Sequence, residues 1–257
     1  MAKFWVINFK KIKKVLFVLI GIVLTISTCN YFCKREILQV SNLDRLLPIY
    51  SVETNKKQVA ITFDCAWGAD DIPSIIDTLV SNDVNAAFFM VGDWIEKYPD
   101  AVRLLGENNL ELGNHSDSHV HVNNLSYEKN IEDMKACNEK IKNLTGKDTK
   151  FYRGPYGEYN NTVIQAAESL NMKVIQWDID TLDYTGKTAD EMCERIKKKL
   201  RNGSIILMHN DTEYTAKGLQ QIINCIKEEG YEIVPLSELI YFENYTINHE
   251  GRQIKSK

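Results

Sequence analysis

The sequence has no excess of positive charge outside its first 35 residues. The 257-residue chain carries 31 Lys and Arg against 35 Asp and Glu. Seven of those cations and none of the acids fall within residues 1–35, which leaves 24 cations against 35 acids in the rest of the chain, a net charge of −11. A nucleic-acid partner needs a basic face that neutralises phosphates, so the composition argues against nucleic-acid binding.

The chain also lacks a dense cysteine framework. It has six cysteines, of which Cys29 and Cys33 belong to an apolar stretch near the N-terminus. The other four, at positions 65, 137, 193 and 225, are far apart, and three of them fall in helix-like stretches. Single buried thiols are therefore expected for those three, rather than a disulfide-stapled fold.

The N-terminal apolar stretch has no clean small-x-small cleavage site. Lysines at 10, 11, 13 and 14 precede an apolar run over 15–28 that is shorter than the ~20 residues of a usual membrane span, and continuation to Cys33 makes it long enough. Lysines before such a run keep the N-terminus in the cytoplasm. We expect a basic cytoplasmic segment over 1–14, an uncleaved membrane anchor over 15–33 and a body outside the cytoplasm. A cleaved signal peptide, which would make the protein secreted, is the alternative.

Short apolar runs alternate with helical stretches over the rest of the chain. Expected strands are 58–63, 86–91, 110–112, 151–152, 173–177, 204–208 and 231–234, and expected helices are 72–81, 98–108, 126–144, 162–170, 189–200, 219–228 and one starting at 236. This alternation predicts a parallel sheet covered by helices, with a small closed (β/α) barrel favoured over an open doubly wound sheet. Residues 34–55 read as a linker or an opening strand, 56–241 as the domain and 242–257 as a frayed polar tail.

Polar residues follow the buried strands. His115 and His119 are four residues apart after the third strand, a spacing that on its own is a weak metal signal. The other strand exits carry Asp64 and Cys65, Arg153 to Gly157, Asp178, Asp180 and Asp183, and His209 to Asp211. Because the carboxyl ends of parallel strands converge, these side chains are expected at one mouth.

Hydrolysis is the chemistry that such a mouth can perform. Two neutral imidazoles and one anionic ligand hold a zinc-like ion with an open position, and the ion lowers the pKa of a bound water to roughly 7. A carboxylate can accept the proton of that water, and a separate histidine can protonate the leaving amine. Backbone N–H groups of the 154–157 turn can face the oxyanion.

Five ordered motifs carry a resemblance to a known family. They are Thr62-Phe63-Asp64, His115-Ser116-x-x-His119, Arg153-x-Pro155-Tyr156-Gly157, Asp180-x-x-Asp183-Tyr184 and Leu207-x-His209. In order and spacing they resemble the polysaccharide deacetylases, the carbohydrate esterase family 4 enzymes that share the NodB homology domain. The resemblance covers about Lys57 to Ile240 and is strongest to peptidoglycan-directed and sporulation-type members with one N-terminal anchor. It implies a distorted (β/α) barrel of about seven strands, and metal-dependent removal of N-acetyl groups from glycans.

The resemblance also implies roles for single residues. Asp64 matches the catalytic base and His209 the catalytic acid, while Arg153 matches the arginine that holds the base. His115 and His119 match the metal-binding histidines, and Tyr156 lies where the family offers a backbone N–H to the oxyanion. Asp180 or Asp183 would orient His209 and pair with Arg153, and the sequence leaves open which does which. Trp67 follows the first motif and can stack on a sugar ring or pack under the rim.

The chain departs from the family at the third metal ligand. The family usually has a second aspartate after the base, and here that residue is Cys65. Three interpretations stay open: Cys65 is a ligand, Asp70 or Asp71 supplies the carboxylate, or metal binds weakly. Packing of Cys65 as a small thiol beneath the site stays open beside its ligation. Asp70 or Asp71 is slightly favoured, since oxygen would keep the water nucleophilic; zinc is the expected metal, with cobalt or manganese as alternatives.

Two functions from different classes follow. The first is a membrane-anchored N-deacetylase acting on peptidoglycan amino sugars or another N-acetylglucosamine polymer. The second is a glycan-binding protein that keeps the barrel and has lost effective catalysis, and Cys65 motivates it. The intact base, acid, arginine and histidine pair favour the enzyme.

Overall fold

The computed structural model describes residues 21–22, 24–25, 27–28 and 45–256. The chain divides into two units, Met1–Arg45 and Leu46–Lys257. The expected basic segment 1–14, most of the expected anchor 15–33 and residues 34–44 of the expected linker lie outside the described residues. Among the residues that are described, no helix has both the length and the apolar character needed to cross a bilayer.

A curved parallel sheet forms the centre of the second unit. Its strands run in the order β6-β5-β4-β3-β2-β8-β7, and β9 pairs with the beginning of β2. The bounds are β2 Gln58–Cys65, β3 Ala87–Met90, β4 Glu111–Asn114, β5 Phe151–Tyr152, β6 Lys173–Val174, β7 Ile179–Asp180, β8 Ile205–His209 and β9 Glu232–Ile233. The parallel α/β class is confirmed.

The expected closed barrel is wrong in one respect, because the sheet is open between its outermost strands β6 and β7. The segment that leads into the domain covers this gap. Ile49 bridges to Ile175 beside β6, and Ser51 bridges to Ser204 beside β8. The structure is therefore a half-barrel whose opening is spanned by residues 49–52.

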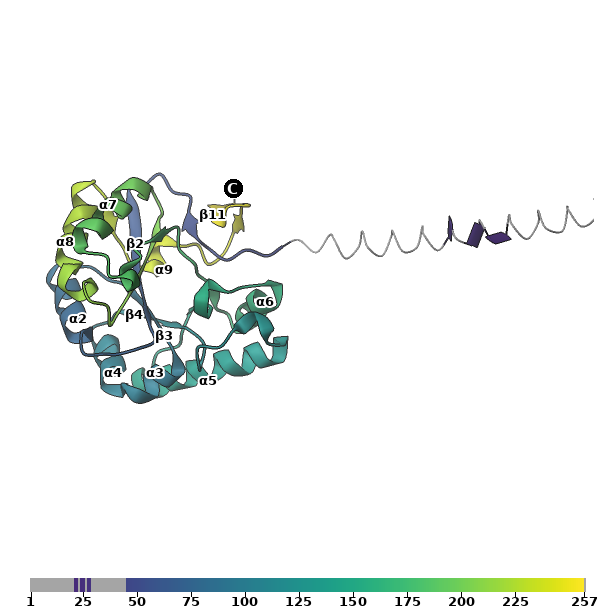
Figure 1. The fold of residues 1–257 in the computed structure, drawn as a ribbon, viewed down its shortest axis with the longest axis horizontal. Helices are drawn as coiled ribbons and strands as arrows, with labels where there is room; N and C mark the ends of the chain where they lie inside the picture. Colours follow the sequence, from purple (N-terminus) through teal and green to yellow (C-terminus); the bar gives the residue numbers. More distant parts are fainter. Residues whose placement is uncertain (1–20, 23, 26, 29–44, 257) are drawn as a thin grey trace, which may run out of the picture. The chain divides into compact units, whose positions relative to one another are not determined.

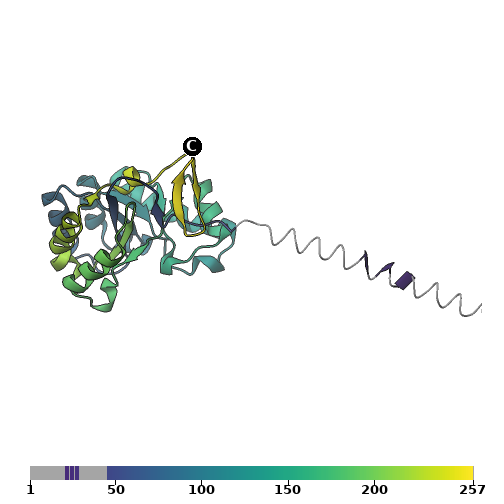
Figure 2. The same ribbon diagram turned by 90° about the horizontal axis from the view of Figure 1, so that it is seen from above.

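Helices form an outer layer around the sheet (Figures 1 and 2). They are α2 Ile72–Ser81, α3 Gly92–Lys97, α4 Pro99–Glu107, α5 Tyr127–Thr145, α6 Asn161–Ser169, α7 Ala189–Lys199, α8 Thr215–Glu228 and α9 Leu236–Leu239. The helix expected over 98–108 is confirmed as α4, and α3 is an additional helix before it that was not expected. Pro99 begins α4, since a proline lacks the N–H that would continue α3.

The C-terminal segment is ordered rather than frayed. Strands β10 Tyr245–Ile247 and β11 Arg252–Lys255 form an antiparallel hairpin, and β11 pairs in parallel with β1 Ser51–Val52. The buried side chain of Gln253 accepts a hydrogen bond from the Tyr241 N–H and donates one to the Tyr241 carbonyl. Both ends of the unit are thus held in one small sheet, which a search for long apolar runs could not detect.

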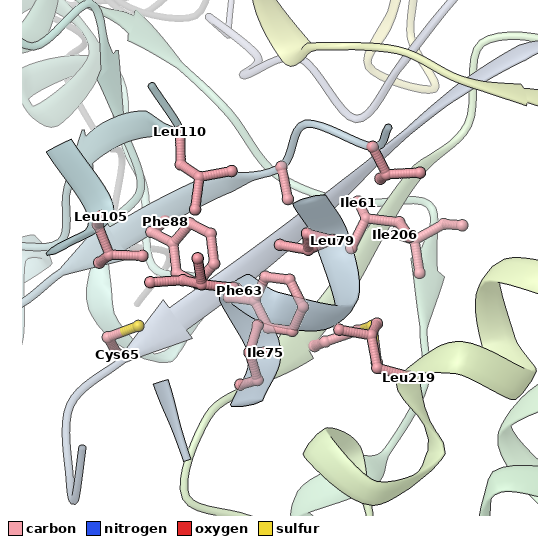
Figure 3. Packing of buried hydrophobic residues seen from close by; sticks show 14 of the residues in the cluster. Ile61, Phe63, Cys65, Ile75, Leu79, Phe88, Leu105, Leu110, Ile206 and Leu219 are labelled. Carbon is pink, nitrogen blue, oxygen red and sulfur yellow. The ribbon is translucent and has the colours of Figure 1, made fainter. Parts of the chain in front are cut away.

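Alternation along β2 separates the helix-covered core from the concave face of the sheet. Val59, Ile61, Phe63 and Cys65 belong to the cluster that packs against the helices, as Figure 3 shows for the last three. Thr62 and Asp64 point to the other face, because successive side chains of a strand lie on opposite sides. This alternation decides which residues can reach the site.

Candidate active site

The candidate base is Asp64 near the end of β2, and a buried arginine holds it. Arg153 Nη1 donates to Asp64 Oδ1 at 2.6 Å, and Arg153 is fully buried. Its remaining donors reach Thr62 Oγ1 and the carbonyls of Ile175 and Gln176. Burial alone would raise the pKa of Asp64, but the charges of Arg153 and the nearby histidines lower it below 3.8. Asp64 is therefore an anion at neutral pH.

The candidate acid is His209 at the end of β8. Its Nδ1 lies 2.8 Å from Asp183 Oδ1, and its backbone N–H donates to Asp183 Oδ2 at 2.6 Å. Burial alone would lower the pKa of His209, but the hydrogen bond to Asp183 and the charges of Asp64 and Asp183 raise it above 6.5. The pair is suited to hold a proton on His209 until a leaving group takes it.

The two loop histidines approach each other beside the base. The rings of His115 and His119 have centroids 5.2 Å apart. His115 Nδ1 lies 2.8 Å from the Arg153 carbonyl, which leaves Nε2 facing Asp64 Oδ2 at 3.6 Å. Burial lowers the pKa of His115 below 6.5. Burial, together with the charge that a protonated His115 would carry, lowers the pKa of His119 to about 4. Both imidazoles are thus neutral at pH 7, the form that binds metal.

The structure brings none of the three candidates for the third metal ligand to these histidines. Cys65 follows Asp64 on the strand, so its thiol lies on the opposite face among Phe63, Phe88 and Leu105 (Figure 3). Burial raises the pKa of this thiol well above 9.0. Asp70 lines a separate groove beside α3 and α4.

The alternative carboxylate, Asp71, is also engaged elsewhere. It accepts a hydrogen bond from the backbone N–H of Asp211 at 2.8 Å. Across the described part of the chain, no three His, Cys, Asp or Glu side chains are grouped so that they could hold a metal ion. The residues present supply two imidazoles, and they do not fit a centre with three protein ligands.

The described side chains enclose a pocket of about 390 Å³ at the carboxyl ends of the strands. Asp64, His115, His119 and His209 line it, together with Tyr156, Trp67, Trp177, Asp180 and Tyr184. The side chains of Trp67, Tyr156 and Tyr184 are more than half exposed. Exposed aromatic faces around a polar floor are suited to stack on sugar rings.

Tyr156 has a left-handed backbone, with φ at 59°. Its ring stacks on His121 at a centroid distance of 4.5 Å, and His121 in turn contacts Glu158 at 2.7 Å. His121 therefore supports the ring of Tyr156.

The aspartates after the fifth expected strand have separate places. Asp183 is the partner of His209, while Asp180 lines the pocket and accepts a hydrogen bond from the Leu182 N–H. Arg153 was also expected to pair with one of these two aspartates, and it pairs with Asp64 instead. Asp178 was expected at the mouth, but it binds the Ile205 N–H and Arg201 at the start of β8. The extra strand β7 lies between Asp178 and the site and accounts for this difference.

Two sets of residues that support the site were not predicted from the sequence. Thr215 Oγ1 donates to Asp183 Oδ2 at 2.7 Å, and its position six residues after His209 was the available signal. Asp133 of α5 accepts hydrogen bonds from Ser116 Oγ and the Asp117 N–H, so it fixes the loop between the histidines. No local motif marks Asp133, because the contact spans sixteen residues.

Comparison with known proteins identifies the family. The polysaccharide deacetylase family model matches residues 51–175. A peptidoglycan-N-acetylglucosamine deacetylase of Bacillus cereus is 30% identical over 194 residues, which cover 74% of this chain and 70% of that protein. The YlxY protein of Bacillus subtilis, described as uncharacterized, is 30% identical, and the match spans only 60% of its length.

Solved structures share the fold. Wild-type BA3943 of Bacillus anthracis, called a carbohydrate esterase family 4 pseudoenzyme, has a TM-score of 0.72 at 32% identity, with 75% of this chain and 68% of that chain covered. The Bc1960 peptidoglycan N-acetylglucosamine deacetylase has a TM-score of 0.71 at 29% identity, with 75% and 92% covered. Fold, motifs and relatives agree, and the chain belongs to the polysaccharide deacetylase family, carbohydrate esterase family 4.

Proposed function

We propose that the chain is a deacetylase that hydrolyses the N-acetyl groups of peptidoglycan amino sugars. The observation that carries the proposal is the placement of a held base and a held acid in one pocket. Asp64 is fixed by Arg153, His209 is fixed by Asp183, and both line the same cavity. Relatives named as peptidoglycan deacetylases support the substrate class.

The geometry suggests how these residues act on an amide. Asp64 accepts a proton from the attacking water, and its low pKa keeps it ready to do so at neutral pH. His209 gives its proton to the departing amine, and Asp183 stabilises the charged ring before that transfer. The backbone N–H of Tyr156 is the proposed donor to the oxyanion. The exposed ring of Trp67 is the proposed platform for a sugar ring.

The test is acetate release by the full chain from peptidoglycan and from N-acetylglucosamine oligomers, with zinc, cobalt or manganese supplied. Zinc is the proposed metal because imidazole ligands suit it, and cobalt and manganese are the alternatives to be compared with it. Asp64→Asn and His209→Ala should each lower the rate about 10²- to 10⁴-fold. His249→Ala is the matched control, because His249 is an exposed histidine of the C-terminal hairpin. Equal rates in wild type and Asp64→Asn would overturn the assignment.

A glycan-binding protein without catalysis is the second candidate, and one observation favours it. Cys65 stands on the core side of β2, and among the described residues no third ligand joins the histidine pair. BA3943 was named a pseudoenzyme, and a mutant of it has restored activity. This candidate predicts that the chain is retained on peptidoglycan, that it releases no acetate, and that Trp67→Ala weakens retention.

We further propose that the domain lies outside the cytoplasm on a single N-terminal membrane anchor. The support is the lysine cluster at residues 10–14 followed by the apolar stretch 15–33. Protease added to intact cells should digest the domain of an anchored protein, while a cytoplasmic protein would survive until the cells are lysed. Mass measurement of the mature chain distinguishes an uncleaved anchor from a cleaved signal peptide.

A further inference from the structure

Two cysteines meet across the interface between α7 and α8, away from the active-site pocket. Cys193 Sγ lies 3.8 Å from the Gln221 carbonyl of α8, and Cys225 Sγ lies 3.8 Å from the Cys193 carbonyl of α7. Each thiol thus rests against the backbone of the opposite helix. The neighbouring Cys225 adds to burial in raising the pKa of Cys193 to about 12.

The pair differs from the other two described cysteines in its access to solvent. Cys193 and Cys225 are 7% and 4% exposed and line a surface groove of about 760 Å³, whereas Cys65 and Cys137 have no exposed surface. The same groove is lined by two basic side chains, Lys197 and Lys217, and by three acidic ones, Asp190, Glu194 and Glu228. Burial raises the pKa of both cysteines, and the positive charge of Lys197 offsets part of that rise.

We propose that Cys193 and Cys225 are an oxidation site, at which a low-molecular-weight disulfide converts the two thiols into a disulfide that joins α7 to α8. The expectation of single buried thiols is confirmed for these two residues, which are buried and free, and the proposal concerns what an added oxidant does to them. The chemistry is independent of the deacetylase proposal. Its use in the cell rests on the extracytoplasmic position proposed above, since disulfides persist in such compartments.

The reaction balances as two thiol–disulfide exchanges. One protein thiolate attacks the small disulfide, forms a mixed disulfide and releases one small thiol. The second protein thiolate then attacks the protein sulfur of that mixed disulfide, forms the Cys193–Cys225 bond and releases the second small thiol. Two protein thiols are oxidised, one small disulfide is reduced to two thiols, and the two protein protons end on those thiols.

The bond would close a loop that contains β8 and therefore His209. Residues 193–225 include the whole of β8 Ile205–His209 and the start of α8 with Thr215. Closing a loop of this length restricts the unfolded chain. The crosslinked protein should melt about 5–10 °C above the reduced protein.

The experiment treats the reduced full chain with oxidised glutathione at pH 8.5, blocks the remaining thiols with N-ethylmaleimide, and maps the peptides by mass spectrometry without reduction. We expect a linked peptide pair containing Cys193 and Cys225, and loss of the pair after dithiothreitol. The melting temperature of the treated protein should rise by the amount given above.

Variants make the result specific. Cys193→Ser should abolish the link and the rise in melting temperature, whereas Cys137→Ala should keep both. The peptide map also separates any reaction of Cys29 or Cys33 from this one. Recovery of both cysteines alkylated, or of a glutathione adduct that never resolves into the linked pair, would overturn the proposal. The wild-type map decides between these outcomes even if a variant folds poorly.

Discussion

His209 and Asp183 share two hydrogen bonds, one from the ring and one from the backbone of the histidine. The Nδ1 atom lies 2.8 Å from Oδ1, and the backbone N–H donates to Oδ2 at 2.6 Å. Asp183 is almost fully buried, and Thr215 holds its second oxygen as well. The carboxylate therefore fixes both the orientation and the charge of the candidate acid.

Asp183→Asn should slow acetate release about 10²- to 10⁴-fold, because an amide no longer favours the protonated ring that donates to the leaving amine. The pKa of His209, followed by NMR of the ring protons, should fall in the same variant. Asp180→Asn is the control, since Asp180 lines the pocket without bonding His209, and its effect on that pKa should be smaller. An unchanged His209 pKa in Asp183→Asn would refute the coupling.

The same pair predicts a pH dependence of stability. The pKa of His209 is higher in the folded protein than its ordinary 6.5, so the folded state binds the proton more tightly. This contribution to the free energy of unfolding is complete below pH 6.5 and disappears as the pH rises through the folded value. Urea titrations from pH 6 to 9 should show the decline in wild type and a flatter profile in Asp183→Asn. Parallel profiles would contradict the assignment.

Arg153 is expected to matter for stability as well as for catalysis. Arg153→Met leaves the buried Asp64 carboxylate without its partner and should lower the free energy of unfolding by about 3–5 kcal/mol. Arg103→Met removes an arginine from an exposed pair with Asp100 and should cost less than about 1 kcal/mol. Denaturant midpoints of the two variants test the contrast, and equal losses would show that burial of the Arg153 pair is unimportant.

Cys65→Ser tests whether the thiol binds metal. The thiol lies in the core cluster on the face of β2 opposite Asp64, so zinc affinity, measured by chelator competition, should stay within about threefold of wild type, since only loss of a true ligand costs much more. His119→Ala should weaken zinc binding at least about tenfold. A tenfold loss in Cys65→Ser would identify the thiol as a ligand and contradict the structure.

The sequence predicted the sheet well where strands are continuous apolar runs. The runs at 58–63 and 204–208 became β2 and β8, which pair side by side in the sheet. The hairpin β10–β11 escaped prediction because its strands are polar and depend on β1, which is about 200 residues away in sequence. A closed barrel also could not be distinguished from an open one, since closure depends on pairing between edge strands.

The sequence predicted those site residues that belong to a motif at the end of a strand. Strand exits placed Asp64, His115, Arg153 and His209 at one mouth, and the structure brings these residues together. The sequence could not show which aspartate contacts His209. Asp180 and Asp183 both come after the expected strand 173–177, and only the fold shows that Asp183 is the partner. Cys65 could not be placed either, since its position depends on whether β2 ends before or after it.

The most direct test of the central claim is acetate release from peptidoglycan by the chelated full chain as zinc is returned, with Cys65→Asp measured in parallel. The deacetylase proposal predicts that wild type releases acetate once zinc is present, and that Asp64→Asn abolishes the release. Acetate from Cys65→Asp alone, with none from wild type at any zinc concentration, would contradict it and identify the natural protein as a glycan-binding relative of the enzymes.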